Sequence, residues 1–251
     1  MRTTILTSFD AAIADFHDGA SLMAFSWGMA GTPQNLLQAL IARGSHDLTL
    51  IAHHVMPAII GKSVVPGVVT LFDLAHQVRK LITAWPGTSY IGLVSPMEQR
   101  IRAGEIELEL QSHGLLTERM RAGGAGIGGF YAQTGLGTLI AEGKETRVID
   151  GKTYLFQLPL TADFAFIRAH RADRLGNLTY RGSARGSNPL MAKAARTVIA
   201  EVDEIVEPGE LDPETIVTPG IYVDRLIQIP AGALGSAAHR RAALAKLTGN
   251  A

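Results

Sequence analysis

The glycine-rich stretch from Arg121 to Thr138, RAGGAGIGGFYAQTGLGT, is the part of the sequence best suited to bind a ligand. Gly124, Gly126 and Gly129 have the spacing G-x-G-x-x-G, which binds a dinucleotide when a strand precedes it and a helix follows it. A helical pattern, LLTERMRA, precedes these glycines instead, so the dinucleotide interpretation is rejected. Loops of this length are uncommon without a function, and glycine lets backbone N–H groups approach a ligand closely. We therefore predict that the stretch binds a carbonyl, carboxylate or phosphate group rather than acting as a spacer.

A second glycine-containing turn, residues 25 to 35 (FSWGMAGTPQN), follows an apolar run that is predicted to be a strand. Thr32 and Pro33 are suited to the N-cap and first position of a helix after it. In open α/β sheets, a turn between the carboxyl end of a strand and a helix N-terminus is a common place for anionic ligands. Ordinary turn chemistry explains the same residues equally well, so both interpretations stay open.

Histidine and glutamate side chains are the next candidates for chemistry. His53 and His54 are adjacent, so on a strand they would point to opposite faces and could not bind one metal ion together. We therefore predict no metal site, although one of the pair could face a pocket at the end of its strand. Glu105, Glu107 and Glu109 alternate with apolar residues, which favours the solvent face of a strand over a pair of catalytic carboxylates.

Ser45, His46 and Asp47 have the residue types of a hydrolase triad, but three consecutive residues cannot form that spatial arrangement. No G-x-S-x-G motif is present either, so serine-hydrolase chemistry is rejected. The sequence has no cysteine, which removes disulfides and thiolate nucleophiles.

Charge and hydropathy exclude two classes of partner. Lys plus Arg and Asp plus Glu both number 23, so no net charge attracts nucleic acid or an anionic membrane. No signal peptide is recognisable, and no apolar run reaches the ~18 residues of a membrane span. We expect a cytoplasmic protein.

Apolar runs that alternate with helical patterns predict an α/β fold, an open, mostly parallel sheet with flanking helices. Asp150 and Gly151 predict a hairpin turn between two short strands. The expected strands are 21–25, 47–52, 106–110, 147–149, 153–157, 162–168 and 197–206. The expected helices are 8–16, 34–42, 71–80, 115–122 and one that begins at Asn188.

The glycine-rich stretch, together with the blocks LGNLTY and TPGIYVD, resembles the α (A) subunits of family I CoA-transferases, the 3-oxoacid and acetate/acetoacetate CoA-transferases. The resemblance covers roughly residues 3 to 229 and implies an open α/β fold of the CoA-transferase/NagB type. It divides the chain into a domain, 1–230, and a C-terminal tail, 231–251.

The resemblance also implies a partner. In that family the nucleophile is a glutamate on the β subunit, in a Ser-Glu-Asn-Gly motif that does not occur here. The chain is therefore expected to work with such a β subunit, as an α2β2 enzyme. Coenzyme A is then a substrate, a carboxylic acid is its acceptor, and no cofactor is bound permanently.

The resemblance also assigns the family's site residues to positions of this sequence. The family's CoA-binding segment corresponds to Phe25, Ser26, Trp27, Gly28, Met29, Ala30 and Gly31. The substrate pocket corresponds to His53, His54, Gly126, Gly128, Gly129, Phe130 and Gln133.

Three departures from the family pattern fall on these segments. Phe25-Ser26-Trp27 replaces Gly-Gly-Phe, which is expected to limit positive φ there. His53-His54 replaces a pair that contains Asn, and Ala132-Gln133 replaces Thr-Pro. The departures predict a changed substrate, or a change of reaction to hydrolysis of a larger acyl-CoA. A non-catalytic ligand-binding relative is the remaining alternative.

Overall fold

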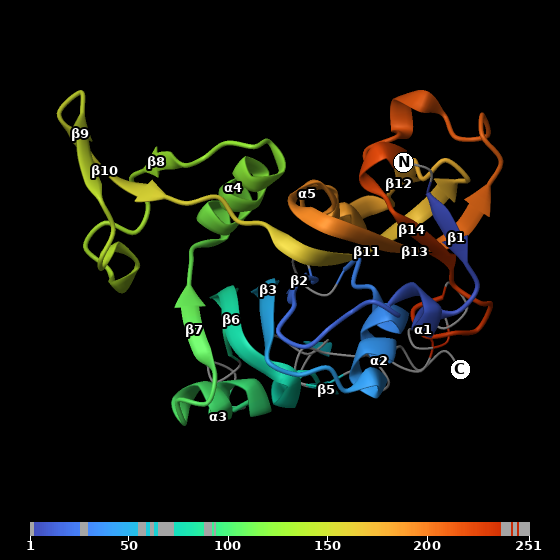
Figure 1. Cartoon of the computed structure of the whole chain (residues 1–251), viewed down its shortest axis with the longest axis horizontal. Coiled ribbons are helices and arrows are strands. Elements are labelled where there is room, and N and C mark those ends of the chain that lie inside the picture. The colour runs from blue at the N-terminus through green and yellow to red at the C-terminus, as the bar shows by residue number, and fades with distance from the viewer. Residues whose placement is uncertain are drawn as a thin grey trace.

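A large sheet forms the centre of the molecule and confirms the predicted α/β fold with its open, mostly parallel arrangement (Figure 1). The computed structural model describes residues 3–25, 30–54, 59–60, 63–64, 73–87, 92, 94–236, 242 and 245. Within them, eight parallel strands lie in the order β1 (Thr4–Leu6), β14 (Arg225–Gln228), β13 (Ala195–Val206), β11 (Ala162–Asp173), β2 (Ser21–Met23), β3 (Leu48–His54), β6 (Val78–Trp85) and β7 (Glu107–Leu110). β12 (Leu178–Thr179) adds to β11 in the antiparallel sense.

Both faces of this sheet are buried under helices. Alternate residues of β11 point to opposite sides, so Phe164 and Phe166 join one apolar cluster while Ala165 and Ile167 join the other. The first cluster packs against α1 (Phe9–Ala12), α2 (Gln34–Arg43) and α3 (Pro96–Arg102), and the second packs against α4 (His113–Gly124) and α5 (Asn188–Ala194). Figure 1 shows these two helix layers below and above the sheet.

A smaller antiparallel sheet projects from one end of the molecule, at the left of Figure 1. It consists of β8 (Phe130–Ala132), β10 (Lys152–Gln157) and β9 (Thr146–Ile149), and the last two form the hairpin predicted around Asp150 and Gly151. Two further strands, β4 (Ile59–Ile60) and β5 (Ser63–Val64), pair with each other. Short 3-10 helices are η2 (Ala75–Gln77), η4 (Leu139–Ala141), η5 (Gly182–Arg185), η6 (Pro213–Thr215) and η7 (Gly220–Tyr222).

Two predicted helices differ from the structure. The helix expected at 71–80 is wrong, because the described part of that range contains only a turn, η2 and the start of β6. β6 has an apolar centre, Leu81 and Ile82, and lies between β3 and β7, so burial in the sheet outweighs the helical spacing of the residues before it. The helix expected at 8–16 is shorter, and α1 covers only Phe9–Ala12.

Among the described residues, no helix has both the length and the apolar character that crossing a bilayer requires.

Candidate functional site

The carboxyl ends of β2 and β3 carry two of the segments predicted to bind ligands. Open α/β sheets bind ligands at this edge. Phe25 follows β2 with φ of 66°, although its side chain is only 1% exposed. The prediction that phenylalanine would limit positive φ is therefore wrong, and the left-handed conformation at Phe25 costs about 1–2 kcal/mol that its buried ring offsets. Ser26, Trp27, Gly28 and Met29 lie outside the described residues.

Gly31 marks the other end of the predicted CoA-binding segment and is fixed by the region around α5. Its carbonyl oxygen accepts a hydrogen bond of 3.1 Å from Asn188 Nδ2, which also donates to Ala184 O at 3.0 Å. Asn188 is fully buried, and its Oδ1 accepts the backbone N–H of Arg168. A Cβ atom on Gly31 would lie 2.1 Å from Ala184 O, so only glycine fits against η5.

The N-terminus of α2 is occupied by a carboxylate of the chain itself. Glu201 Oε2 on β13 accepts the backbone N–H groups of Asn35 at 2.9 Å and Leu36 at 3.1 Å. The predicted Thr32 cap is wrong, since α2 begins at Gln34 with Pro33 in the cap position and without a side-chain cap bond. Because Glu201 takes the N–H groups of Asn35 and Leu36, an anionic ligand cannot bind through these two groups.

Glu201 belongs to a buried ionic network behind the same segment. Arg168 donates to Glu201 Oε1 at 3.0 Å, to Asp203 Oδ1 at 2.6 Å and to Gly235 O at 3.0 Å. Burial raises the pKa of Glu201, while the Arg168 guanidinium and the two backbone donors oppose that rise. The network holds β11, β13 and α2 together, and Arg168 also holds the start of the C-terminal tail at Gly235.

Three histidines meet at the end of β3. His53 Nδ1 lies 3.5 Å from His113 Nδ1, and the ring centroid of His54 lies 4.7 Å from that of His113. His53 and His54 were predicted to point to opposite faces of a strand. Because β3 ends at His54, both rings instead pack against His113, the first residue of α4. His53 Nε2 also lies 2.8 Å from Ser187 Oγ. Among the described residues, no group of three His, Asp or Glu side chains is placed to hold a metal ion.

Burial makes these histidines resist protonation. It lowers the pKa of both His53 and His54 to about 4, with the neighbouring imidazoles as a second cause, and it lowers the pKa of His113 as well. All three are therefore neutral at pH 7. Neutral imidazole offers one donor and one acceptor nitrogen, so the cluster can contact a ligand by hydrogen bonding rather than by charge.

A pH dependence of stability follows from this cluster. Unfolded histidines bind protons below pH ~6.5 whereas folded His53 and His54 do so only near pH 4, so folding stability is lost as the pH falls between these values. For His53 alone the loss is about 2 kcal/mol between pH 7 and pH 4.5. Urea unfolding at both pH values should show a smaller loss for His53→Asn than for the wild type. The exposed His17→Asn serves as the control, and equal losses in all three proteins would contradict the prediction.

The glycine-rich stretch is divided among several elements. Gly123 and Gly124 end α4 and pack closely against Leu160 O and the Lys193 side chain, which is a structural reason for two of its glycines. Gly126 donates its N–H to Gly123 O. Gly128 and Gln133 are exposed, while Gly129 and Phe130 are half-buried at the start of β8.

The two groups of predicted pocket residues lie at opposite ends of α4. His113, beside His53 and His54, begins the helix, and Gly126, Gly128 and Gly129 follow its end. The twelve residues of α4 span about 16 Å. A single pocket that includes both groups stays a prediction, and within this chain it requires an extended ligand.

The acidic side chains around β7 form ion pairs. They are Glu105 with Arg100 at 2.7 Å, Glu107 with Lys80 at 2.8 Å and Glu109 with Arg119 at 2.6 Å. Glu107 raises the pKa of Lys80, as expected for such a pair. This supports the structural interpretation of the alternating glutamates.

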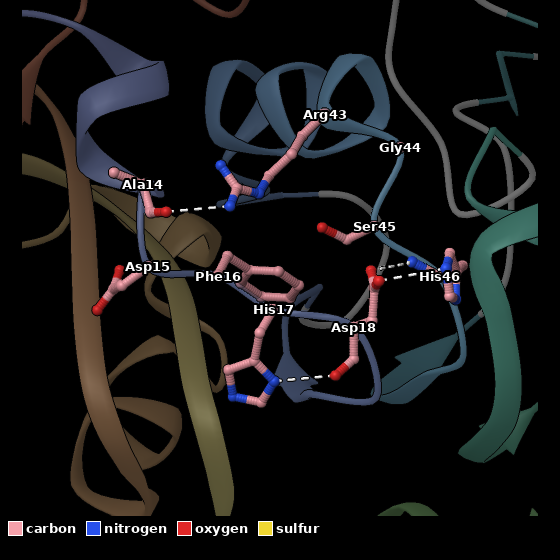
Figure 2. A pocket seen from close by; sticks show the side chains of 9 residues that line it. All are labelled: Ala14, Asp15, Phe16, His17, Asp18, Arg43, Gly44, Ser45 and His46. Atoms are coloured by element: carbon pink, nitrogen blue, oxygen red, sulfur yellow. Dashed lines mark hydrogen bonds and ion pairs between the residues drawn. The ribbon is translucent and has the colours of Figure 1, made fainter.

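An open pocket lies at the opposite edge of the sheet, near the amino ends of β2 and β3 (Figure 2). It encloses about 650 Å³ between residues 14–18 and 43–46. Its side chains bind one another, since His46 bridges Asp18 at 3.2 Å and Asp47 at 2.9 Å, and Arg43 donates to Ala14 O. Because ligands of open α/β sheets bind at the carboxyl edge, we place the site at that edge and not here.

Sequence reasoning missed the side chains that join the two segments. Ser187 and Asn188 reach His53 and Gly31 from the start of α5, and Glu201 reaches α2 from the middle of β13. The buried positions of Arg168 and Glu201 inside apolar strands were the available signal, because a charge that interrupts such a strand requires a partner.

The chain is similar to several known proteins. A family model described as coenzyme A transferase matches residues 6–228. The A chain of the 3-oxoadipate CoA-transferase of Pseudomonas putida is 46% identical over 233 residues, which cover 92% of this chain and 96% of that protein. The alpha chain of the acetate CoA-transferase of Escherichia coli K12 is 45% identical over 227 residues, 90% of this chain and 97% of that protein.

Solved structures share the fold. The decarboxylase AibA/AibB has a TM-score of 0.74 at 27% identity, covering 100% of this chain and 96% of that chain. The glutaconate coenzyme A-transferase of Acidaminococcus fermentans has a TM-score of 0.73 at 19% identity, covering 93% of this chain and 78% of that chain.

Proposed function

The chain belongs to the coenzyme A transferase family, and from that premise we propose that it is the α subunit of a 3-oxoacid-type CoA-transferase. The enzyme moves coenzyme A from an acyl-CoA to a carboxylic acid. The observation that carries this proposal is the 46% identity to one chain of a two-chain CoA-transferase, along almost the whole of both sequences.

The geometry at the carboxyl edge supports a nucleophile on another chain. Glu201, which lies beside the predicted CoA-binding segment, is fully buried and accepts bonds from two backbone N–H groups and Arg168. A carboxylate held in this way cannot attack a thioester. We therefore propose that the nucleophile toward acyl-CoA is a glutamate of a β subunit, and that the two chains form an α2β2 enzyme.

The covalent route then follows from group-transfer chemistry. The partner's carboxylate attacks the thioester carbonyl to give an acyl-glutamyl anhydride and CoA thiolate, and the thiolate forms a glutamyl-CoA thioester while the first acid leaves. The acceptor carboxylate takes the CoA by the reverse steps. Each attack develops negative charge on a carbonyl oxygen, which fixed backbone N–H donors stabilise.

This chain contributes the walls of that pocket in our proposal. Residues 25–31 hold the CoA moiety, anchored at Gly31 by Asn188, and the neutral histidines at the end of β3 face the acyl group. Gly128, Gly129, Phe130 and Gln133 contact the more distant part of the substrate. We infer a 3-oxo acid as the acceptor, from the substrates for which the relatives are named, and a cytoplasmic location.

Co-expression with the chain of the same organism that resembles a CoA-transferase β subunit tests the proposal. We expect the two chains to purify together and to form 3-oxoacyl-CoA from succinyl-CoA and a 3-oxo acid, at rates of ~1 s⁻¹ or more. Each chain alone should be inactive. A stable complex that transfers no CoA among mono- and dicarboxylic acids would overturn the proposal.

A further inference from the structure

The hydrogen bond between Ser187 and His53 has the geometry of a nucleophile and its base. We propose that these two side chains form a second catalytic centre on this chain, which transfers the acyl group of an acyl-CoA to Ser187 and then to water. The inference rests on the proposed function only in assuming that acyl-CoA binds at the carboxyl edge. It differs from that function in its nucleophile, its acceptor and the chain on which the covalent intermediate forms.

The fold brings the two side chains together over a sequence separation of 134 positions. His53 lies near the end of β3, and Ser187 is the residue before α5. Serine in the N-cap position usually accepts a hydrogen bond from its own helix, yet Ser187 makes no such bond and instead lies 2.8 Å from His53 Nε2. This pair departs from the sequence-based rejection of serine-hydrolase chemistry, because residues 134 positions apart cannot appear in a local motif.

A third group orients the base. If Nε2 of His53 accepts from Ser187, the ring proton of His53 is on Nδ1, which faces Nδ1 of His113 at 3.5 Å. The two rings are nearly parallel, 16° apart, with centroids 5.7 Å apart. A nucleophile, a base within hydrogen-bond reach and a group that orients the base are the arrangement that activates serine hydroxyls in enzymes.

Burial keeps the base available and also makes it weak. His53 is 5% exposed, and its pKa of about 4 leaves Nε2 unprotonated at neutral pH. A base with a pKa far below the working pH is less effective, so the hydrolysis should be slower than CoA transfer.

The substrate is brought to this pair by the neighbouring residue. Asn188, directly after Ser187, holds the carbonyl of Gly31 at 3.1 Å. Gly31, the last residue of the segment proposed to hold CoA, is therefore hydrogen-bonded to Asn188, the residue directly after Ser187. A thioester bound next to Gly31 would then lie near the Ser187 hydroxyl.

The reaction balances without any further reactant than water. Ser187 Oγ bonds to the thioester carbonyl while its proton moves to His53 Nε2, the C–S bond breaks, and the CoA thiolate takes that proton. Water then attacks the Ser187 ester and gives a proton to His53 Nε2. The acid leaves as Ser187 Oγ regains the proton, so that acyl-CoA and water become acid and CoA thiol.

Acyl-CoA hydrolysis without an acceptor, measured with the complex of this chain and its partner, tests the proposal. We expect Ser187→Ala and His53→Asn each to lower the hydrolysis rate about 100-fold. The rate of CoA transfer is measured in the same preparations, and Ser187→Ala should lower it less than it lowers hydrolysis. Ser183→Ala, which removes an exposed serine four residues earlier, should leave both activities unchanged. In quenched reactions, the acyl mass should be found on the peptide of this chain that contains Ser187.

A cysteine variant gives a readout that does not depend on turnover. The chain has no cysteine, so Ser187→Cys introduces its single thiol. As a general base His53 takes the thiol proton during attack, so alkylation by iodoacetamide should be about tenfold faster than in the double variant with His53→Asn. Equal alkylation rates, or hydrolysis by Ser187→Ala at the wild-type rate, would overturn the second centre. Transfer activity that persists in those experiments would leave the proposed function intact.

Discussion

Gly31→Ala is expected to weaken coenzyme A binding at least tenfold and to lower the melting temperature by about 10 °C. The new Cβ would lie 2.1 Å from Ala184 O and 2.7 Å from Asn188 Nδ2, at a backbone φ of +74°. The φ costs about 1–2 kcal/mol, and the overpacking costs about 1–3 kcal/mol more. Each kcal/mol lowers the melting temperature of a chain of this size by about 2–4 °C. Gly31, which must move to relieve this contact, is the last residue of the segment proposed to hold CoA. The KM for acyl-CoA should therefore rise in the same variant that loses stability.

Gly44→Ala is the matched control for this variant. Gly44 has nearly the same φ, +73°, but a Cβ there meets nothing within 4 Å, and it lies at the other end of α2. We expect only the backbone cost, a fall in melting temperature of about 2–8 °C and a KM within twofold of wild type. Equal effects of the two alanines on KM would show that contact with η5 and Asn188 does not position the segment.

Glu201→Gln is expected to cost about 3 kcal/mol of unfolding free energy, close to the largest loss that one polar change can give in this fold. Glutamine has the same shape, so the variant removes the charge without leaving a cavity. Arg168 then loses one of its two carboxylate partners in a site where Glu201 is 0% exposed, and breaking a buried pair costs about 3–5 kcal/mol. The remaining contact of Arg168 with Asp203 places the expected value at the lower end of that range.

Glu204→Gln, three residues later on β13, separates burial from charge. Glu204 accepts from Arg171 Nε at 2.7 Å, and both partners are partly exposed, at 53% and 34%. Exposed pairs contribute about 0–1 kcal/mol, so this variant should unfold at nearly the wild-type urea concentration. If both glutamines lowered the urea midpoint equally, burial of the Arg168 network would not be the source of the stability.

Much of the fold could be predicted from the sequence because β2 and β3 are short, mainly apolar runs, and the twelve-residue strands β11 and β13 have buried apolar centres. β6 was predicted wrongly as helix because the residues before it have helical spacing, and only its neighbours β3 and β7 make a strand the better solution. β1 was not predicted, since three residues at the edge of a sheet carry too little pattern to be recognised.

Only those parts of the candidate site whose residues lie close together in the sequence could be predicted. The ends of β2 and β3 were expected to carry the site from turn chemistry and from the family resemblance, and this placement stays a prediction. Ser187, Asn188 and Glu201 were missed because their contacts join positions 134 to 166 residues apart, and no spacing rule connects such positions. At Phe25 a local rule failed instead. Phenylalanine disfavours a positive φ, but the burial of its ring holds that conformation here.

The central claim is that this chain supplies a CoA-binding wall and that its partner supplies the nucleophile. Intact masses of both chains, taken after the complex is mixed with acyl-CoA and quenched, test this most directly. We predict that the partner chain gains the mass of coenzyme A less one water, at a glutamate, and only when this chain is present. A CoA adduct that forms on the isolated partner at the same rate, or no adduct on the partner during active CoA transfer, would contradict the account.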